Sequence, residues 1–240
     1  MTPWSYQPAS DLDASIVERL RRFPREPDMF VYGARSAAAL VLRAWLRGYH
    51  RLRISGAENL PRQGSFVMVA NHASHLDTLC LLASLPLRKL HRAFPAAAKD
   101  YFFVDLPRAA LAAIVVNALP FGRQSQIRHS LQLCRELLNN PGNVLILYPE
   151  GTRTVTGKLG EFRAGVGLLV AGTNIPVAPC HLSGAFEAWP KGALWPRPRR
   201  IRLRIGALRT YADFSNDKEG VERIVLDLRE AVGRMGETKK

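Results

Sequence analysis

The chain has 240 residues, enough for one sizeable α/β domain with a small appendage. Apolar residues make up 47% of it and charged residues 22%, proportions that exclude an intrinsically disordered chain. Its net charge of +14, from 34 basic and 20 acidic residues, calls for an anionic partner. Nucleic acid, an anionic membrane surface and a phosphorylated substrate all qualify.

The three cysteines, Cys80, Cys134 and Cys180, are scattered through apolar runs. Neither a disulfide framework nor a zinc-ligand spacing can be made from them. We therefore predict no metal site and a reducing compartment. The first residues, 1–13, also lack the basic start and apolar core of a secretion signal.

Residues 29–50 mix apolar side chains with Arg35, Arg43 and Arg47 at helical intervals, which predicts an amphipathic helix. The best candidate for a membrane span, residues 36–46, is interrupted by Arg43, and no uncharged apolar run reaches the roughly 18 residues that a span needs. The helix either packs on the domain's own core or docks at a membrane interface. On the second interpretation the protein lies on the membrane rather than across it.

From residue 51 onward, strand and helix patterns alternate. The continuous apolar runs 65–70 and 144–148 are typical of strands buried on both faces. Further strands are predicted at 93–98, 175–182 and 200–206, and helices at 106–118 and 126–138. This alternation predicts an α/β fold, a mixed and mainly parallel sheet covered by helices and preceded by the N-terminal amphipathic helical segment. We detect no internal repeat and no second domain.

The first predicted strand of this series ends at Asn71 and His72, on the edge where open α/β sheets carry their chemistry. Histidine can accept a proton near neutral pH, and a carboxylate on its other ring nitrogen would fix its tautomer. Asp77 lies five residues later. On a continuous helix the two side chains would point about 140° apart. They can meet only if His72 lies in a loop and Asp77 in the first turn of the next helix.

A structural interpretation of Asp77 also stays open. Ser74 and Asp77 have the spacing of a capping box, in which Asp77 would serve the helix N-terminus. His75 could compete with His72 as a base, although no carboxylate stands at a matching spacing from it.

A second candidate site stretch, LYPEGTRT, covers residues 147–154. Gly151 would let the backbone approach a ligand closely, and Arg153 offers a planar fork for phosphate oxygens. Gly122 and Arg123 form another such pair before a helix, so the two turns fit an anion site. Alternatively, each arginine pairs with a surface carboxylate. The spacings of a P-loop, a serine-hydrolase elbow and a zinc peptidase are all missing.

Together, NHASHLD, PFGR, YPEGTR and IPVAPC resemble the blocks of the glycerolipid acyltransferase superfamily, typified by 1-acylglycerol-3-phosphate acyltransferase. The resemblance implies an N-terminal helical, membrane-docking segment (1–50) and an acyltransferase domain (51–240). It implies an enzyme that moves a fatty acyl group from acyl-CoA or acyl carrier protein to the hydroxyl of a lysophospholipid. The expected acceptor is 1-acylglycerol-3-phosphate, with no cofactor and no covalent acyl-enzyme. Another lyso-lipid or an amine-bearing lipid stays open as acceptor.

By the same resemblance, His72 is the general base and Asp77 its orienting partner. The residues implied to bind substrate are Gly122, Arg123, Glu150, Gly151, Thr152, Arg153, Arg163 and Pro176. Two features depart from the family pattern. Tyr148 stands where phenylalanine is common, and PFGR is shorter than the usual second block, which leaves the acceptor head group open.

A binding module is the alternative from another functional class. Residues 200–206 alternate arginine with apolar residues, and Arg197 and Arg199 stand beside them. This basic face could contact nucleic acid, but it lacks the interleaved aromatic residues of a stacking platform. A solvated edge-strand face, anionic lipid head groups and an acidic carrier protein are the other interpretations. We expect a peripheral or monotopic location on the cytoplasmic face of a membrane, the inner membrane being expected.

Overall fold

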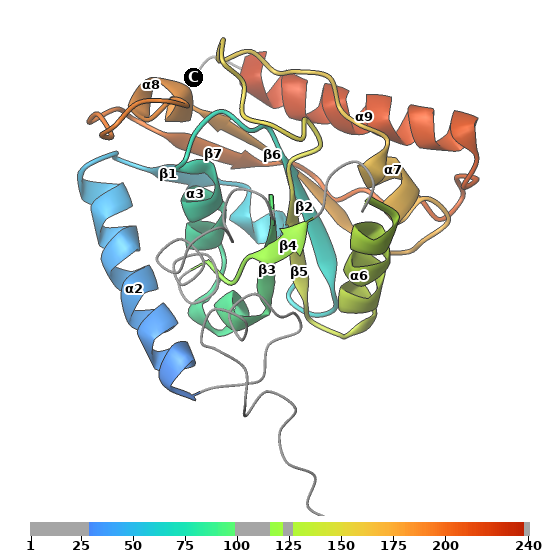
Figure 1. The fold of residues 1–240 in the computed structure, drawn as a ribbon, viewed down its shortest axis with the longest axis horizontal. Coiled ribbons are helices and arrows are strands. Elements are labelled where there is room, and N and C mark those ends of the chain that lie inside the picture. Colours follow the sequence, from blue (N-terminus) through green and yellow to red (C-terminus); the bar gives the residue numbers. More distant parts are fainter. Residues whose placement is uncertain (1–28, 99–115, 122–126, 238–240) are drawn as a thin grey trace, which may run out of the picture.

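The structure, a computed structural model, describes residues 29–98, 116–121 and 127–237. Within them, seven strands form one sheet in the order β1-β7-β6-β2-β5-β3-β4 (Figure 1). The strands are β1 (Arg53–Ser55), β2 (Phe66–Ala70), β3 (Ala93–Ala98), β4 (Leu119–Phe121), β5 (Val144–Leu147), β6 (Val177–Ser183) and β7 (Arg202–Ile205). Every neighbouring pair is parallel except β6 and β7, so the predicted mixed, mainly parallel sheet is confirmed.

Helices cover both faces of this sheet. They are α2 (Met29–Gly48), α3 (Asp77–Ser84), α6 (Ile127–Asn139), α7 (Gly165–Val170), α8 (Ala185–Ala188) and α9 (Lys218–Glu237), with 3-10 turns η1 (Ala57–Asn59) and η2 (Leu87–Arg92). One core cluster joins α2 and α3 to the sheet, and another joins α6, α7 and α9 to its opposite face. Side chains of β2 alternate between the two clusters, Phe66 and Met68 in one and Val67 and Val69 in the other. This is why its sequence is apolar throughout.

The register of the central strands places the site. β5 runs parallel to β2, and Val69 pairs with Leu147. Both strands therefore end at the same edge of the sheet, and the segments that follow, 71–76 and 148–154, leave it side by side.

Most elements match the sequence predictions. The five predicted strands are present as β2, β3, β5, β6 and β7, and the predicted helices at 29–50 and 126–138 are α2 and α6. The helix predicted at 106–118 lies mainly outside the described residues, and its last three positions, 116–118, are not helical. The sequence interpretation missed β1, β4, α9 and the short helices α7 and α8.

The basic strand β7 is not an edge strand, so that interpretation was wrong. It pairs with β1 on one side and with β6 on the other. Arg202 and Arg204 are half-buried, and Arg204 donates to the main-chain carbonyl of Met235 in α9. Long side-chain stems let these arginines occupy an interior strand, and Arg204 also contacts α9.

The orientation of α2 differs from that of an ordinary amphipathic helix. Two of its arginines face inward: Arg35 is only 4% exposed and donates to Asn117 Oδ1 at 3.2 Å, and Arg43 donates to the carbonyl of Leu85. Two of the polar side chains of α2, Arg35 and Arg43, therefore hydrogen-bond to the domain instead of facing solvent.

The outer side of α2 is mainly apolar, with Arg47 exposed in its last turn. Met29, Leu40 and Val41 are 83%, 54% and 70% exposed, while Leu46 on the inner side is fully buried. Across the residues that the structure describes, no helix has the length and apolar character needed to cross a bilayer. The helix thus packs on the core and leaves an apolar stripe uncovered.

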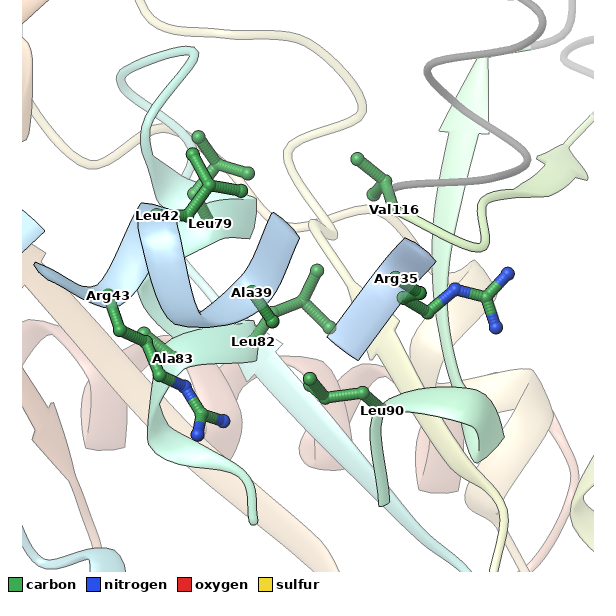
Figure 2. Close-up of a pocket in the computed structure, with 9 residues that line it drawn as sticks. All are labelled: Arg35, Ala39, Leu42, Arg43, Leu79, Leu82, Ala83, Leu90 and Val116. Atoms are coloured by element: carbon green, nitrogen blue, oxygen red, sulfur yellow. The ribbon is translucent and has the colours of Figure 1, made fainter. Parts of the chain in front are cut away.

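A narrow cleft with only about 20 Å³ of enclosed space lies between α2 and α3 (Figure 2). Ala39, Leu42, Leu79 and Leu82 give it apolar walls, and Figure 2 shows the guanidinium groups of the flanking arginines on opposite sides of Ala39. The α3 residues that line it begin at Leu79, two positions after Asp77.

Candidate functional site

The structure brings His72 and Asp77 together at the carboxyl edge of β2. His72 lies in the loop after the strand, and Asp77 is the first residue of α3, as the spacing argument required. His72 Nδ1 is 2.8 Å from Asp77 Oδ2, and the two side chains are 22% and 0% exposed. A carboxylate accepts here, so Nδ1 carries the proton and the lone pair resides on Nε2.

The same Asp77 oxygen also accepts the backbone N–H groups of Ala73 and Ser74, each at 2.7 Å. The bond to Ser74 is one half of the predicted capping box. The other half is different, because Ser74 Oγ accepts from Leu76 N–H at 3.1 Å. One buried carboxylate therefore shapes the loop and holds the imidazole, and the structural and chemical interpretations of Asp77 coexist.

The ring of Tyr148 stacks on the imidazole of His72, with centroids 4.0 Å apart and planes inclined by 18°. Its hydroxyl and that of Thr78 are 2.9 Å apart. Burial raises the pKa of the Tyr148 phenol well above its usual value, so the ring stays neutral. Tyr148 restrains His72 from the side that Asp77 does not reach.

Glu150 connects the two turns at this edge. Its Oε1 accepts the backbone N–H of His72 at 2.7 Å, and its Oε2 accepts that of Gly160 at 2.9 Å. The side chain is 8% exposed, and burial raises the pKa of its carboxyl, an effect that the two N–H donors oppose. These contacts position the backbone of His72.

Gly151 is favoured because its φ of 73° lies in the left-handed region. A Cβ there would come within 2.8 Å of Arg163 Nε and would displace that side chain. The backbone N–H of Arg163 also donates to the carbonyl of Pro149 at 2.9 Å. The side chain of Arg163 therefore lies across the 148–151 turn.

Arg153 from the same turn reaches the first loop, where its Nη1 donates to His75 Nε2. Burial, followed by the charge of Arg153, lowers the pKa of His75 to about 4. His75 is therefore neutral near pH 7 and its Nε2 is occupied. His75 therefore holds Arg153 in place, and its Nε2 is not available to accept a proton from a substrate. His72 is the better placed base.

Of the remaining residues predicted to bind substrate, only Thr152 lies at the His72 edge of the sheet within the described residues. Thr152 is exposed in the same turn as Gly151. Pro176 precedes β6 at its amino end, where its carbonyl accepts from Val67. Six residues at roughly 3.3 Å each separate that end of the sheet from the level of His72, so the structure does not bring Pro176 to the pair. Gly122 and Arg123 lie outside the described residues.

Sequence reasoning missed several groups around His72. The stacking of Tyr148 and the part played by Gly160 depend on tertiary contacts that no local pattern reveals. Trp189 is another: its carbonyl accepts from Ser74 Oγ at 2.8 Å, and its indole lies 5.0 Å from the His75 ring. The departure from the family pattern at Tyr148 was the one available hint.

The cysteines have the features of inert core residues. Cys80, Cys134 and Cys180 are free and buried, and burial raises the pKa of all three thiols, that of Cys134 to about 12. Within the described ranges, no group of three or more His, Cys, Asp or Glu side chains could hold a metal ion.

The family model named Acyltransferase matches residues 51–183, which include both turns and the strands that carry them. The chain belongs to the acyltransferase family. Among curated proteins, it is 34% identical over 149 residues to the chloroplastic 1-acyl-sn-glycerol-3-phosphate acyltransferase LPAT1 of Arabidopsis thaliana, covering 60% of this chain and 39% of that protein. It is 40% identical over 174 residues to the 1-acyl-sn-glycerol-3-phosphate acyltransferase of Cocos nucifera, covering 72% and 54%. The chain thus spans about two fifths to just over half of these relatives.

The fold also has a solved counterpart. The crystal structure of the 1-acyl-sn-glycerophosphate acyltransferase PlsC from Thermotoga maritima matches with a TM-score of 0.65, covering 88% of this chain and 82% of that one. Sequence identity is 22%, so this likeness shows the shared α/β architecture alone.

Proposed function

We propose that this acyltransferase-family protein transfers a fatty acyl group from an acyl thioester to the free hydroxyl of a lysophospholipid. The preferred acceptor is 1-acylglycerol-3-phosphate, and the product is phosphatidic acid. The observation that carries the proposal is the buried Asp77 holding His72 at 2.8 Å on the carboxyl edge of β2. The names of the relatives support this acceptor.

In the proposed reaction, His72 Nε2 takes the proton from the acceptor hydroxyl as its oxygen attacks the thioester carbonyl. The ester C–O bond forms, the C–S bond breaks as the tetrahedral intermediate collapses, and the proton passes from His72 to the leaving sulfur. Asp77 stabilises the imidazolium that exists between these steps. The acceptor hydroxyl attacks directly, so no covalent acyl-enzyme forms and no cofactor is needed. Either acyl-CoA or acyl carrier protein can supply the thioester.

The acceptor's phosphate is proposed to bind beside the 148–154 turn. Arg153 and Arg163 both lie at this turn, and Thr152 is exposed within it. A planar guanidinium pairs well with phosphate oxygens. We assign Gly122 and Arg123 to the same phosphate site on the family resemblance.

The cleft between α2 and α3 is proposed to take an apolar chain of one substrate. Its apolar walls are mainly leucine and alanine side chains (Figure 2). Leu79 and Leu82 come from α3, the helix that begins at Asp77. A fatty acyl chain needs an apolar channel, and the cleft has an apolar lining; its enclosed space of about 20 Å³ would have to widen to admit the chain.

The N-terminal segment 1–50 is proposed to dock on the membrane that holds the acceptor. The apolar outer stripe of α2, with Leu40 and Val41 more than half exposed, supports this role. An interfacial helix buries such a face among the lipid head groups and upper acyl chains. We propose a peripheral location on the cytoplasmic face of a membrane, with residues 51–240 forming the acyltransferase domain.

The function is tested by incubating the purified protein with labelled palmitoyl-CoA, or with palmitoyl carrier protein, and a panel of lyso-lipids. Formation of phosphatidic acid from 1-acylglycerol-3-phosphate, at the highest kcat/KM of the panel, is the expected result. Transfer to a different lyso-lipid or to an amine-bearing lipid would redirect the acceptor. Absence of transfer to every acceptor with both donors would reject the proposal.

The phosphate site is tested separately with Arg153→Ala. Loss of a phosphate contact made equally in the ground and transition states raises KM and spares kcat. We expect KM for 1-acylglycerol-3-phosphate to rise about tenfold, the cost of roughly 1.4 kcal/mol, while KM for an uncharged monoacylglycerol stays unchanged. An equal rise for both acceptors would place Arg153 outside the phosphate site.

A further inference from the structure

The segment 190–200, between α8 and β7, carries an uncommon surface. Leu194 and Trp195 are adjacent and 80% and 76% exposed. Exposed single hydrophobic residues are ordinary, but a leucine beside a tryptophan at the tip of one loop forms an apolar knob.

Basic side chains surround this knob. Lys191, Arg197, Arg199 and Arg200 are all exposed, and the segment contains no acidic residue. Among the residues that the structure describes, no carboxylate forms an ion pair with any of these four cations. The loop therefore combines an exposed apolar tip with uncompensated positive charge.

The base of the loop is fixed rather than loose. Trp189 Nε1 donates to the carbonyl of Ala193 at 2.9 Å, and the backbone N–H of Arg197 donates to the carbonyl of Ala188 at 2.7 Å. Prolines at 190, 196 and 198 further restrict the backbone. Such a loop presents its tip in a defined direction and loses little conformational entropy on binding.

This loop adjoins the C-terminal end of α2, to the upper left in Figure 1. The Tyr49 hydroxyl donates to the carbonyl of Pro196 at 3.2 Å, and Tyr49 itself is 41% exposed. The apolar stripe of α2 and the loop are thus joined through Tyr49. The residue just before the loop, Trp189, contacts Ser74 and His75 beside the candidate site.

We propose that residues 190–200 form a second membrane-contacting element. Leu194 and Trp195 insert at the boundary between head groups and acyl chains, and the four cations pair with the phosphates of anionic lipids. This inference rests on the proposed function for its purpose, which is to hold the mouth of the His72 site at the membrane. Its evidence, the composition and exposure of the loop, is independent of turnover.

A lipid surface fits this loop better than another polyanion. Tryptophan is favoured at membrane interfaces because its ring is apolar and its N–H is polar, and adjacent lysines and arginines attract anionic head groups. Duplex nucleic acid would leave the exposed leucine without an apolar partner. The knob and the cations together therefore favour a bilayer.

The test uses the full chain and vesicles of phosphatidylcholine with 30% phosphatidylglycerol, a composition of about one anionic lipid in three. Leu194→Ala/Trp195→Ala is expected to weaken the affinity for these vesicles, measured by sedimentation, about tenfold, because two apolar side chains that would be partly buried in the membrane are lost. Leu226→Ala, at a residue 55% exposed on α9, is the matched control and is expected to bind like the wild type. Replacing Lys191 and Arg197 by Gln should weaken binding about fivefold for each cation removed, and high salt should abolish this difference.

Insertion itself is measured with vesicles whose lipids carry bromine on the acyl chains. Bromine quenches tryptophan at close range, so wild-type fluorescence should fall more than that of Trp195→Phe. Equal quenching of the two proteins, or vesicle binding by Leu194→Ala/Trp195→Ala within twofold of the wild type, would overturn the proposal. Loop-dependent binding to duplex DNA or to acyl carrier protein, with no such dependence on vesicles, would overturn it too.

A water-soluble, short-chain acceptor separates this proposal from the proposed function. The double loop variant should acylate that acceptor at the wild-type rate, because the loop side chains take no part in the chemistry. If no protein acylates any acceptor while vesicle binding still depends on the loop, the proposed function fails and the membrane contact stands.

Discussion

The His72 loop and helix α2 both bury polar side chains, but with opposite outcomes for the surface. In the loop, Asp77 and Glu150 are enclosed; Asp77 Oδ2 and both oxygens of Glu150 accept from neighbouring backbone N–H groups, and Asp77 Oδ2 also accepts from the His72 ring. In α2, Arg35 and Arg43 turn inward to Asn117 and Leu85, and the side left outside is apolar.

The difference shows what each buried contact accomplishes. A buried carboxylate that accepts several donors fixes the geometry around one ring nitrogen, which a general base requires. Inward arginines anchor a helix by its polar residues and free its apolar residues for another partner. The same requirement to satisfy buried polar groups thus builds a reacting centre in one region and a docking surface in the other.

Among the residues that hold His72, Asp77→Asn is expected to have the largest effect on the first region. The amide keeps the size of the side chain. However, either its N–H₂ group or its weaker oxygen acceptor now faces the three donors, which are His72 Nδ1 and the backbone N–H groups of Ala73 and Ser74. The tautomer of His72 is then no longer fixed. We expect kcat to fall about 10³-fold, with KM for the acyl donor little changed. A loss below about tenfold in steady-state assays would remove Asp77 from the mechanism.

The next largest effect is expected from Glu150→Gln. One amide oxygen can still accept, but its N–H₂ group opposes the N–H of either His72 or Gly160. We expect a loss of about 1–3 kcal/mol in the free energy of unfolding and a fall in kcat of tenfold or more, since the His72 backbone shifts. Chemical denaturation and rate measurements check both. Glu161→Gln, at a side chain 85% exposed, is the control that should change neither.

The second region is tested by Leu40→Glu/Val41→Glu, which makes the outer stripe of α2 charged without touching its inner contacts. Binding to anionic vesicles should weaken about tenfold, and thermal stability should stay close to that of the wild type. The counterpart substitution Leu226→Glu on α9 should leave vesicle binding unchanged. If both variants weaken binding alike, net charge rather than the α2 stripe controls docking.

The smallest effect is expected at Tyr148, where the ring and the hydroxyl can be separated. Tyr148→Phe removes the hydroxyl contact with Thr78 and keeps the stack on His72, so kcat should stay within about threefold of the wild type. Tyr148→Leu removes the stack and should lower kcat about tenfold. Equal rates for the two variants would show that the stacking does not restrain the base.

Local patterns in the sequence predicted much of this architecture. Apolar runs located the central strands because strands buried on both faces must be apolar, and the spacing of His72 and Asp77 implied a loop followed by a helix start. These predictions hold because they depend on residues within a few positions of one another.

The parts that sequence could not predict depend on distant partners. Glu150 bonds to the backbone of His72, 78 positions away, and Arg35 bonds to Asn117, 82 positions away. The helical pattern of α2 showed two faces but not which of them the domain would cover. Likewise, an alternating strand such as β7 does not reveal whether a three-residue neighbour pairs with its outer side.

The most direct test of the central claim compares His72→Ala with the wild type for acyl transfer from palmitoyl-CoA to 1-acylglycerol-3-phosphate, alongside thermal unfolding of both proteins. His72 supplies the base, and its side chain is not a core packing residue, so we predict that kcat falls about 10³-fold or more while the unfolding temperature is retained. A well-folded His72→Ala protein with activity within tenfold of the wild type would contradict the account.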